Sequence, residues 1–130
     1  MGSSRGIKSS ARILVVDDDE SIRTLLAEFF REEGYEVRTA VHGRQALDLI
    51  SESPFDVILT DMSMPVMGGQ ELASTLNDRG IVTPLVVMTA AQTAAALAQA
   101  IHAAGYVGKP FDLETVLSTI DRVIHRHNPP

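Results

Sequence analysis

Two hydrophobic patterns alternate along the chain, and this alternation is what most constrains the fold. Short apolar or β-branched runs are typical of strands covered on both faces. Between them, apolar residues recur every three or four positions, as in amphipathic helices. The expected strands comprise residues 12–16, 35–39, 55–60, 84–89 and 105–108. Five strands alternating with five helices predict an α/β fold with a doubly wound parallel sheet.

The helical segments carry recognisable start and stop signals. Gly34 and Gly80 follow helical patterns and are expected to end them, and Pro54 closes a short helix. Asp112 is a good N-cap for the last helix. The expected helices lie around residues 22–33, 46–53, 71–77, 92–104 and 113–127.

Length and composition limit the classes of protein. A chain of 130 residues fits one domain with a real core, and a net charge of −6 argues against a nucleic-acid surface. The absence of cysteine excludes disulfides, thiol catalysis and zinc–thiolate sites. No segment is a convincing membrane span, and a cytoplasmic location is expected. We expect a domain over residues 11–127, with 1–10 a flexible leader or expression scar and 128–130 a tail or the start of a linker.

Polar residues stand at the ends of several expected strands. Asp17 and Asp18 follow the first strand, and Asp61 follows the third. Thr89 closes the fourth strand and Lys109 follows the fifth. The carboxyl ends of parallel strands share one edge of the sheet, which is where such folds bind ligands. These residues therefore predict a site at that edge.

The residue types indicate the chemistry of the predicted site. Two carboxylates held ~4 Å apart repel by roughly 4 kcal/mol at an effective dielectric of about 20. Protonation of one carboxylate or binding of a hard divalent cation would offset this repulsion. A cation beside an ammonium and a hydroxyl suits phosphoryl oxygens. Phosphoryl transfer to a carboxylate, giving an aspartyl phosphate, is the reaction that fits best.

An ordered set of motifs covers most of the chain. Val-Val-Asp-Asp occupies residues 15–18, Thr-Asp occupies 60–61 with Met-Pro at 64–65, Met-Thr-Ala occupies 88–90 and Lys-Pro-Phe occupies 109–111. Over about residues 11–127 the chain resembles the receiver domains of two-component response regulators. The resemblance implies a flavodoxin-like fold with strand order 2-1-3-4-5. It also implies a cytoplasmic signalling protein and not an enzyme in the usual sense.

The resemblance also implies roles for individual residues. Asp61 would accept a phosphoryl group from a sensor histidine kinase or a histidine phosphotransfer protein. The metal ligands would be Asp17, Asp18, Asp61 and the backbone carbonyl of Ser63, with Mg²⁺ as cofactor and Mn²⁺ as an alternative. The phosphoryl group would be bound by Lys109, Thr89 and the backbone of Ala90. The receiver would catalyse its own phosphorylation and a slow dephosphorylation.

Signal transmission is expected to follow the same pattern. Thr89 and Tyr106 would form the switch, and the Lys109–Pro110 peptide is expected to be cis. Their movement would change the surface of the fourth helix, fifth strand and last helix, where a downstream protein binds. Receivers that dimerise there usually carry opposite charges, which this uncharged fourth helix lacks. A monomer or weak dimer is therefore expected.

Several positions depart from the family pattern. Gly68 stands where an Asp often caps the next helix. Ser63 and Ala91, at the positions that tune hydrolysis, cannot act as acid or base, which predicts slow dephosphorylation. The connection from Thr89 to Tyr106 is shorter than in many receivers, and this leaves the length of the fourth helix open.

Two other functions stay open. The first is a phosphorylation-independent interaction module on the same fold. The second is a haloacid dehalogenase-like phosphohydrolase, loosely suggested by Asp17-x-Asp19-x-Ser21, which leaves Asp61 unexplained. Asp19 is instead expected to be a helix cap. The four histidines are expected at the surface, and the methionines after Asp61 are expected to pack in the loop. The chain would be either a stand-alone receiver or a segment of a larger regulator or hybrid kinase.

Overall fold

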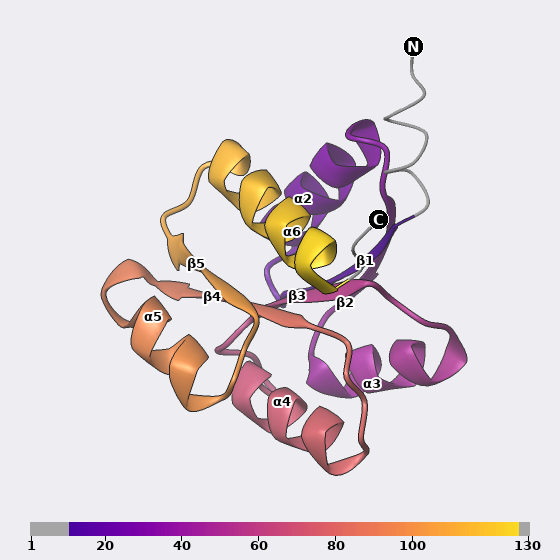
Figure 1. Ribbon diagram of the computed structural model, residues 1–130. Coiled ribbons are helices and arrows are strands. Elements are labelled where there is room, and N and C mark those ends of the chain that lie inside the picture. Colours follow the sequence, from indigo (N-terminus) through magenta and orange to yellow (C-terminus); the bar gives the residue numbers. More distant parts are fainter. Residues whose placement is uncertain (1–10, 128–130) are drawn as a thin grey trace.

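The computed structural model describes residues 11–127, which form one parallel sheet flanked by helices (Figure 1). The strands are β1 (Arg12–Val16), β2 (Glu36–Ala40), β3 (Val57–Asp61), β4 (Leu85–Ala90) and β5 (Gly105–Lys109). The helices are α2 (Glu20–Glu32), α3 (Gly43–Glu52), α4 (Gly69–Asp78), α5 (Ala91–Ala100) and α6 (Leu113–His127). The sheet order is β2-β1-β3-β4-β5, and every pairing is parallel. The predicted doubly wound fold is confirmed.

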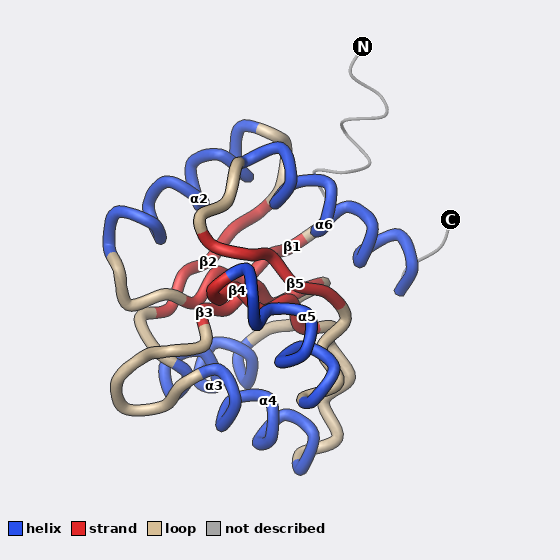
Figure 2. Tube along the Cα trace, turned by 90° about the vertical axis from the view of Figure 1, so that its left-hand side faces the viewer, coloured by secondary structure: helices blue, strands red, loops and turns tan. Residues whose placement is uncertain are grey.

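Helices cover both faces of the sheet (Figures 1 and 2). On one face α2 and α6 pack through Phe30 and Ile120 against Val15 and Leu59. The other face is covered by α3, α4 and α5, and its buried cluster includes Leu72 of α4. Because both faces are buried, the strands are continuously apolar instead of alternating, and this is the pattern visible in the sequence.

The register of the strands aligns their carboxyl ends. Val16, the last residue of β1, is level with Thr60, so Asp17 follows at the level of Asp61. In turn, Asp61 is level with Met88 in β4. One edge of the sheet therefore collects the polar residues that follow or end these strands.

Polar caps and glycines limit several helices. The Asp19 carboxylate accepts hydrogen bonds from the amides of Ser21 and Ile22, which confirms its expected role as a helix cap. The Asp112 carboxylate accepts one from the Thr115 amide at 2.8 Å, as expected for an N-cap. Gly80 follows α4 with a φ of 70°, a left-handed conformation that favours glycine.

Some element boundaries differ from the sequence prediction. The third strand begins at Val57 and not at residue 55, and it includes Asp61 as its last residue. The prediction that the fourth helix runs to residue 104 was wrong, because α5 ends at Ala100. His102 adopts a left-handed φ of 59°, and its amide and that of Ala103 close the helix end. A histidine in place of the usual glycine gave no stop signal in the sequence.

The length of the fourth helix, which the sequence left open, is ten residues, and the helix begins directly after β4. Among residues 11–127, no helix combines the length and hydrophobicity that a membrane-spanning segment needs. The expected leader and tail, residues 1–10 and 128–130, lie outside the described residues.

Candidate phosphoryl-transfer site

Asp61 ends the most buried strand of the sheet. Residues 57–60 of β3 are fully buried, and Asp61 is only 7% exposed. The Lys109 ammonium lies 2.5 Å from its Oδ1 atom, and the Ser63 amide donates to its Oδ2 atom at 3.1 Å. Because a buried carboxylate needs such partners, these donors explain how a charge is held at the end of an apolar strand.

Asp17 is still more buried, at 1% exposed, and only one of its two carboxylate oxygens accepts a hydrogen bond. Its Oδ1 atom accepts a hydrogen bond from the Asp19 amide at 2.9 Å. Its Oδ2 atom is buried with no hydrogen-bond partner among the described residues, although the Lys109 ammonium is 3.9 Å away. Burial, with smaller contributions from the charges of Asp61 and Asp18, raises the pKa of Asp17 above its ordinary value. The Asp19 amide and Lys109 oppose that rise.

The backbone of Asp17 is also held in place. Its amide donates to the carbonyl oxygen of Ala40 at 3.1 Å, and its own carbonyl accepts from the Arg23 guanidinium at 2.8 Å. Arg23 was not identified from the sequence. Its position on a helix with several charged residues gives no signal of this contact.

Lys109 ends β5 and is the cation of the site. Burial by itself lowers the pKa of Lys109, but the hydrogen bond that its ammonium donates to Asp61 and the charges of Asp61, Asp17 and Asp18 raise it above its ordinary value. The ammonium therefore stays protonated at neutral pH. The peptide that follows, Lys109–Pro110, is cis.

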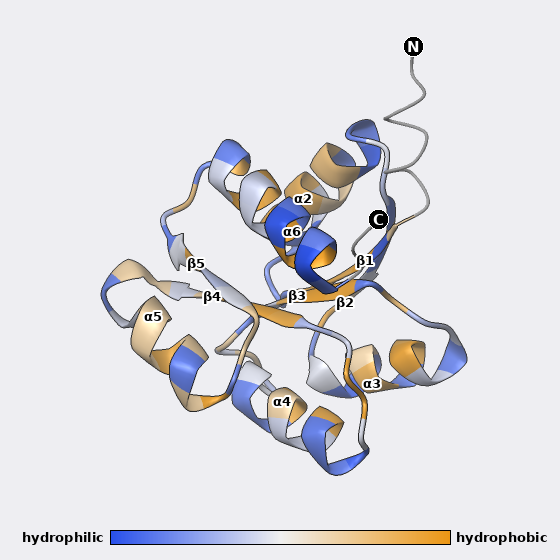
Figure 3. Ribbon diagram, in the orientation of Figure 1, coloured by the Kyte–Doolittle hydropathy of each residue, from blue (hydrophilic) through white to orange (hydrophobic). Residues whose placement is uncertain are grey.

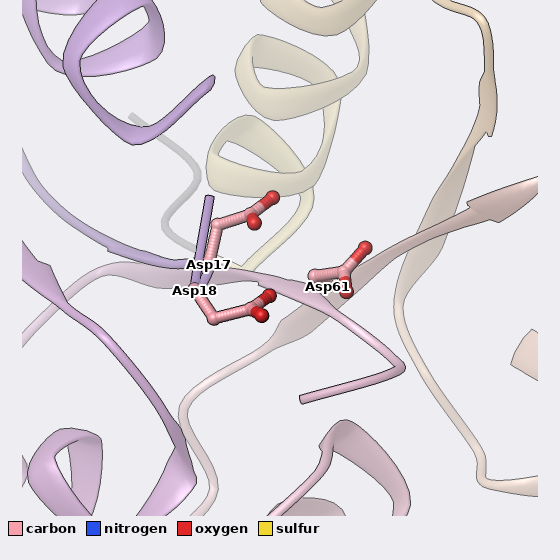
Figure 4. Close-up of side chains that lie close together, drawn as sticks. All are labelled: Asp17, Asp18 and Asp61. Carbon is pink, nitrogen blue, oxygen red and sulfur yellow. The ribbon is translucent and has the colours of Figure 1, made fainter. Parts of the chain in front are cut away.

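Three carboxylates converge at this edge of the sheet (Figure 4). Asp17, Asp18 and Asp61 each offer an oxygen, and these oxygens lie within 4.8 Å of one another. A cluster of oxygen ligands with one buried, unpartnered oxygen fits a hard divalent cation. Asp18 is exposed, so one side of the cluster faces solvent, as suits an ion that keeps several waters. Of the two ways to offset the repulsion, the geometry fits a cation.

The loop after Asp61 approaches the neighbouring α3 closely. The Gly43 amide donates to the carbonyl oxygen of Met67 at 2.9 Å, and a Cβ atom on Gly43 would lie 2.7 Å from Met67 Cγ. Sequence reasoning missed this use of Gly43; a glycine at the start of a helical pattern was its only signal. Gly68 is the N-cap of α4, and because glycine has no side chain, no side-chain hydrogen bond caps this helix, as expected from the sequence. Met67 is buried, which confirms the expected loop packing.

The residues expected to act as the switch lie on the two neighbouring strands. Thr89 is half-buried, one residue beyond the level of Asp61, and it is followed by Ala90 at the end of β4. Tyr106 in β5 is 49% exposed and lines a groove between α5 and α6. The structure does not bring Tyr106 into the acidic cluster.

The two positions expected to tune hydrolysis, Ser63 and Ala91, are both exposed. Ala91 begins α5 and packs over Gly108, where a Cβ atom would lie 2.8 Å from the Ala91 Cα atom. Gly108 therefore permits the close approach of α5 to β5. No pattern in the sequence gives Gly108 a role beyond its place in the strand.

Neither the histidines nor the Asp19 carboxylate belongs to the acidic cluster. His42 is half-buried and N-caps α3 by accepting from the Gln45 amide at 3.2 Å, which corrects its assignment as a plain surface residue. The other three, His102, His125 and His127, are exposed. Because the Asp19 carboxylate caps α2, it is not available for the paired-aspartate motif of a haloacid dehalogenase-like enzyme.

Comparisons with known proteins agree with this geometry. A family model for the response regulator receiver domain matches residues 13–121. The response regulator MprA of Mycolicibacterium vanbaalenii is 36% identical over 120 residues, which cover 91% of this chain and 52% of MprA. The chain thus spans about half the length of that relative.

Solved structures resemble the chain over nearly all of their own length. The chemotaxis response regulator CheY4 of Vibrio cholerae is 39% identical with a TM-score of 0.79, covering 87% of this chain and 98% of CheY4. TrrA of Thermotoga maritima, solved in complex with Mg²⁺ and BeF, is 32% identical with a TM-score of 0.77 and the same coverage. The chain belongs to the family of response regulator receiver domains.

Proposed function

We propose that this receiver domain is a phosphorylation-dependent switch in which Asp61 accepts a phosphoryl group from a histidine kinase or a histidine phosphotransfer protein. The observation that carries the proposal is the pairing of Asp61 with Lys109 beside two further carboxylates. Membership of the receiver family supports the same function.

The transfer needs a nucleophile and charge neutralisation. A bond forms between a carboxylate oxygen of Asp61 and phosphorus, while the bond from phosphorus to the donor's histidine nitrogen breaks. The ring nitrogen leaves with the bonding electron pair. The product is an aspartyl phosphate. The protonated Lys109 would stay beside the phosphoryl oxygens, with the Thr89 hydroxyl and the Ala90 amide as further donors.

The acidic cluster supports a divalent cation as cofactor. Mg²⁺, or Mn²⁺ as an alternative, would be held by Asp17, Asp18, Asp61 and the carbonyl oxygen of Ser63. When bound, the cation would neutralise charge on the carboxylates and the phosphoryl group. TrrA was solved with Mg²⁺ and BeF, and we extend that chemistry to this chain by analogy.

Transmission would run from Thr89 to Tyr106. In this proposal the Thr89 hydroxyl moves toward the phosphoryl group and the half-exposed Tyr106 ring turns inward. That movement changes the surface formed by α5, β5 and α6, to which a downstream protein binds. The activity is self-catalysed phosphorylation followed by slow dephosphorylation, because Ser63 and Ala91 offer no acid or base to guide water.

The proposal is tested by intact-protein mass spectrometry after incubation with acetyl phosphate or phosphoramidate and Mg²⁺. We expect a gain of one phosphoryl group that is lost in Asp61→Asn and retained in Asp48→Asn, a control on the exposed side of α3. A phosphorylated histidine phosphotransfer protein then tests the physiological class of donor. Absence of an adduct with every donor would favour the phosphorylation-independent module.

A further inference from the structure

Two adjacent residues at the end of β1 both face the acidic cluster. In an extended strand, successive side chains point to opposite faces of the sheet. Asp17 and Asp18 follow β1 directly, yet Figure 4 shows both carboxylates turned toward Asp61, and an oxygen of each lies within 4.8 Å of the others. The backbone bends at Asp18 to permit this. The orientation of the peptide between Asp17 and Asp18 therefore decides whether both carboxylates can reach one cation.

The Arg23 side chain holds this peptide. Its guanidinium donates a hydrogen bond to the Asp17 carbonyl oxygen at 2.8 Å. That carbonyl belongs to the planar peptide that joins Asp17 to Asp18, so fixing its direction restricts the ψ angle of the first residue and the φ angle of the second together. The Asp17 amide is held separately, by the carbonyl oxygen of Ala40 at 3.1 Å.

Arg23 is itself anchored in the first turns of α2. Its amide donates to the carbonyl oxygen of Asp19 at 2.9 Å, and its side chain is half-buried. Further along the helix, Leu26 and Phe30 are fully buried against the sheet. The colouring of α2 in Figure 3 accordingly changes between hydrophobic and hydrophilic along the helix. The helix is thus a fixed support from which the guanidinium reaches back to the bend after β1.

The Arg23 guanidinium does not neutralise the cluster directly. Among residues 11–127, the carboxylates of Asp17 and Asp61 pair with Lys109, and no carboxylate forms an ion pair with Arg23. The group that Arg23 contacts is an uncharged carbonyl oxygen, to which a charged donor binds more strongly than a neutral one. The contact therefore orients the backbone between two carboxylates.

We propose that Arg23 is a positioning residue that sets the affinity of the acidic cluster for a divalent cation, by holding the peptide between Asp17 and Asp18. Partners that orient metal ligands typically contribute roughly ten- to a hundredfold to metal affinity. Arg23 touches neither the cation nor the phosphoryl group, so its loss weakens binding of the cation and leaves the transfer step itself in place. This inference rests on the part of the proposed function that assigns a cation to the cluster.

The same helix offers a matched control. Arg31, in the last turn of α2, donates to the carbonyl oxygen of Val37 at 2.9 Å, and each arginine bonds a carbonyl six positions away along the chain. Arg23→Met and Arg31→Met therefore remove the same type of contact and keep an unbranched side chain, but only Arg23 contacts a member of the cluster. Arg23→Lys is the conservative variant, because an ammonium can still donate to the carbonyl.

Cation affinity is measured without a phosphodonor. Mn²⁺ titrations are followed by electron paramagnetic resonance of the free ion, and Mg²⁺ titrations by NMR shifts of the amides of residues 17, 18 and 61. We expect Arg23→Met to raise the Kd for both ions roughly tenfold, and Arg23→Lys to raise it less, by roughly threefold. Arg31→Met should leave it unchanged. Urea unfolding in EDTA verifies that each variant is folded, and Arg23→Lys keeps the test decisive if Arg23→Met is unstable.

The initial rate of phosphorylation by phosphoramidate, measured as a function of Mg²⁺ concentration, gives a second readout. In Arg23→Met the Mg²⁺ concentration at half-maximal rate should rise by the same factor as the Kd, and saturating Mg²⁺ should recover the rate. A wild-type Kd in Arg23→Met, or an equal rise in Arg31→Met, would overturn the proposal. So would a lower maximal rate with an unchanged Kd.

The two readouts separate this inference from the proposed function. If the wild type binds Mg²⁺ but takes no phosphoryl group, the proposed switch fails and the titrations alone decide the role of Arg23. If the wild type is phosphorylated and Arg23→Met binds the cation as tightly as the wild type does, only this inference fails. A wild-type protein that binds neither Mg²⁺ nor Mn²⁺ would also overturn it.

Discussion

Neutralising Asp17 should stabilise the metal-free protein, although the residue belongs to the candidate site. Asp17 Oδ2 is 3.9 Å from the Lys109 ammonium, and the three carboxylates lie within 4.8 Å. At an effective dielectric of about 20, the attraction to Lys109 is about 4 kcal/mol and the repulsion from Asp61 about 3.5 kcal/mol. These two contributions nearly cancel, and the exposed Asp18 adds a smaller repulsion. The remaining cost is that of burying an oxygen without a hydrogen-bond partner, about 1–3 kcal/mol.

Asp17→Asn removes the charge, and its amide group can donate to a neighbouring carboxylate. In EDTA we expect a gain of about 1–2 kcal/mol in the free energy of unfolding, or a rise in Tm of roughly 4–8 °C. Asp18→Asn, at an exposed carboxylate, should change stability less, and Asp48→Asn on α3 should change it little. Urea unfolding with thermal melts as a second readout measures all four proteins.

Adding Mg²⁺ should reduce the stability difference between Asp17→Asn and the wild type, or reverse its sign. An ion present at ten times its dissociation constant stabilises the wild type by about 1.4 kcal/mol, and the variant lacks one of the proposed ligands. An Asp17→Asn protein that is less stable than the wild type in EDTA would refute the claim that the Asp17 carboxylate destabilises the metal-free protein. Equal stabilisation of both proteins by Mg²⁺ would refute its proposed role as a ligand.

The same residue predicts a dependence on pH. Because burial raises the pKa of Asp17 above its ordinary 3.8, the folded protein binds a proton more readily than the unfolded chain. In EDTA, the contribution of Asp17 to the free energy of unfolding therefore falls as the pH rises from 3.8 through the raised pKa of the folded state. Above that pKa the destabilisation by Asp17 is complete. The stability difference between Asp17→Asn and the wild type should accordingly be larger at pH 8 than near pH 4 in urea titrations. A difference that grows toward low pH would contradict the sign.

Three further predictions concern the loops and the lifetime of the phosphorylated state. Val66 has a φ of 67° and is 72% exposed, so Val66→Asn should stabilise by about 1 kcal/mol in urea unfolding. Val82→Asn, 89% exposed and without a left-handed φ, should be near neutral, and equal effects would rule out backbone strain as the cause. Gly108→Ala should cost about 1–3 kcal/mol, because its Cβ would meet the Ala91 backbone at 2.8 Å, and an unchanged urea midpoint would contradict that contact. The aspartyl phosphate should persist for minutes or longer, since Ser63 and Ala91 carry no acid or base. Decay of the mass adduct within seconds would disprove this expectation.

Much of the fold could be predicted because hydrophobic periodicity reports which faces are buried. The run 12–16 is continuous since β1 is covered by α2 on one face and by α3 on the other. The parallel arrangement then requires Asp17 and Asp61 to share one edge of the sheet. Boundaries were less certain where no residue marks them, as at the end of α5, where His102 takes the left-handed conformation.

What the sequence determined by itself is therefore the order of strands and helices and the edge at which the polar residues gather. Both follow from local periodicity and from the shared direction of parallel strands. Only the tertiary structure decided that Oδ2 of Asp17 is buried with no hydrogen-bond partner among the described residues, and that Arg23 holds the Asp17 carbonyl. It also decided that a short α5 leaves a groove beside Arg122 and Arg126. These features depend on contacts between residues far apart in the chain, which no local pattern contains.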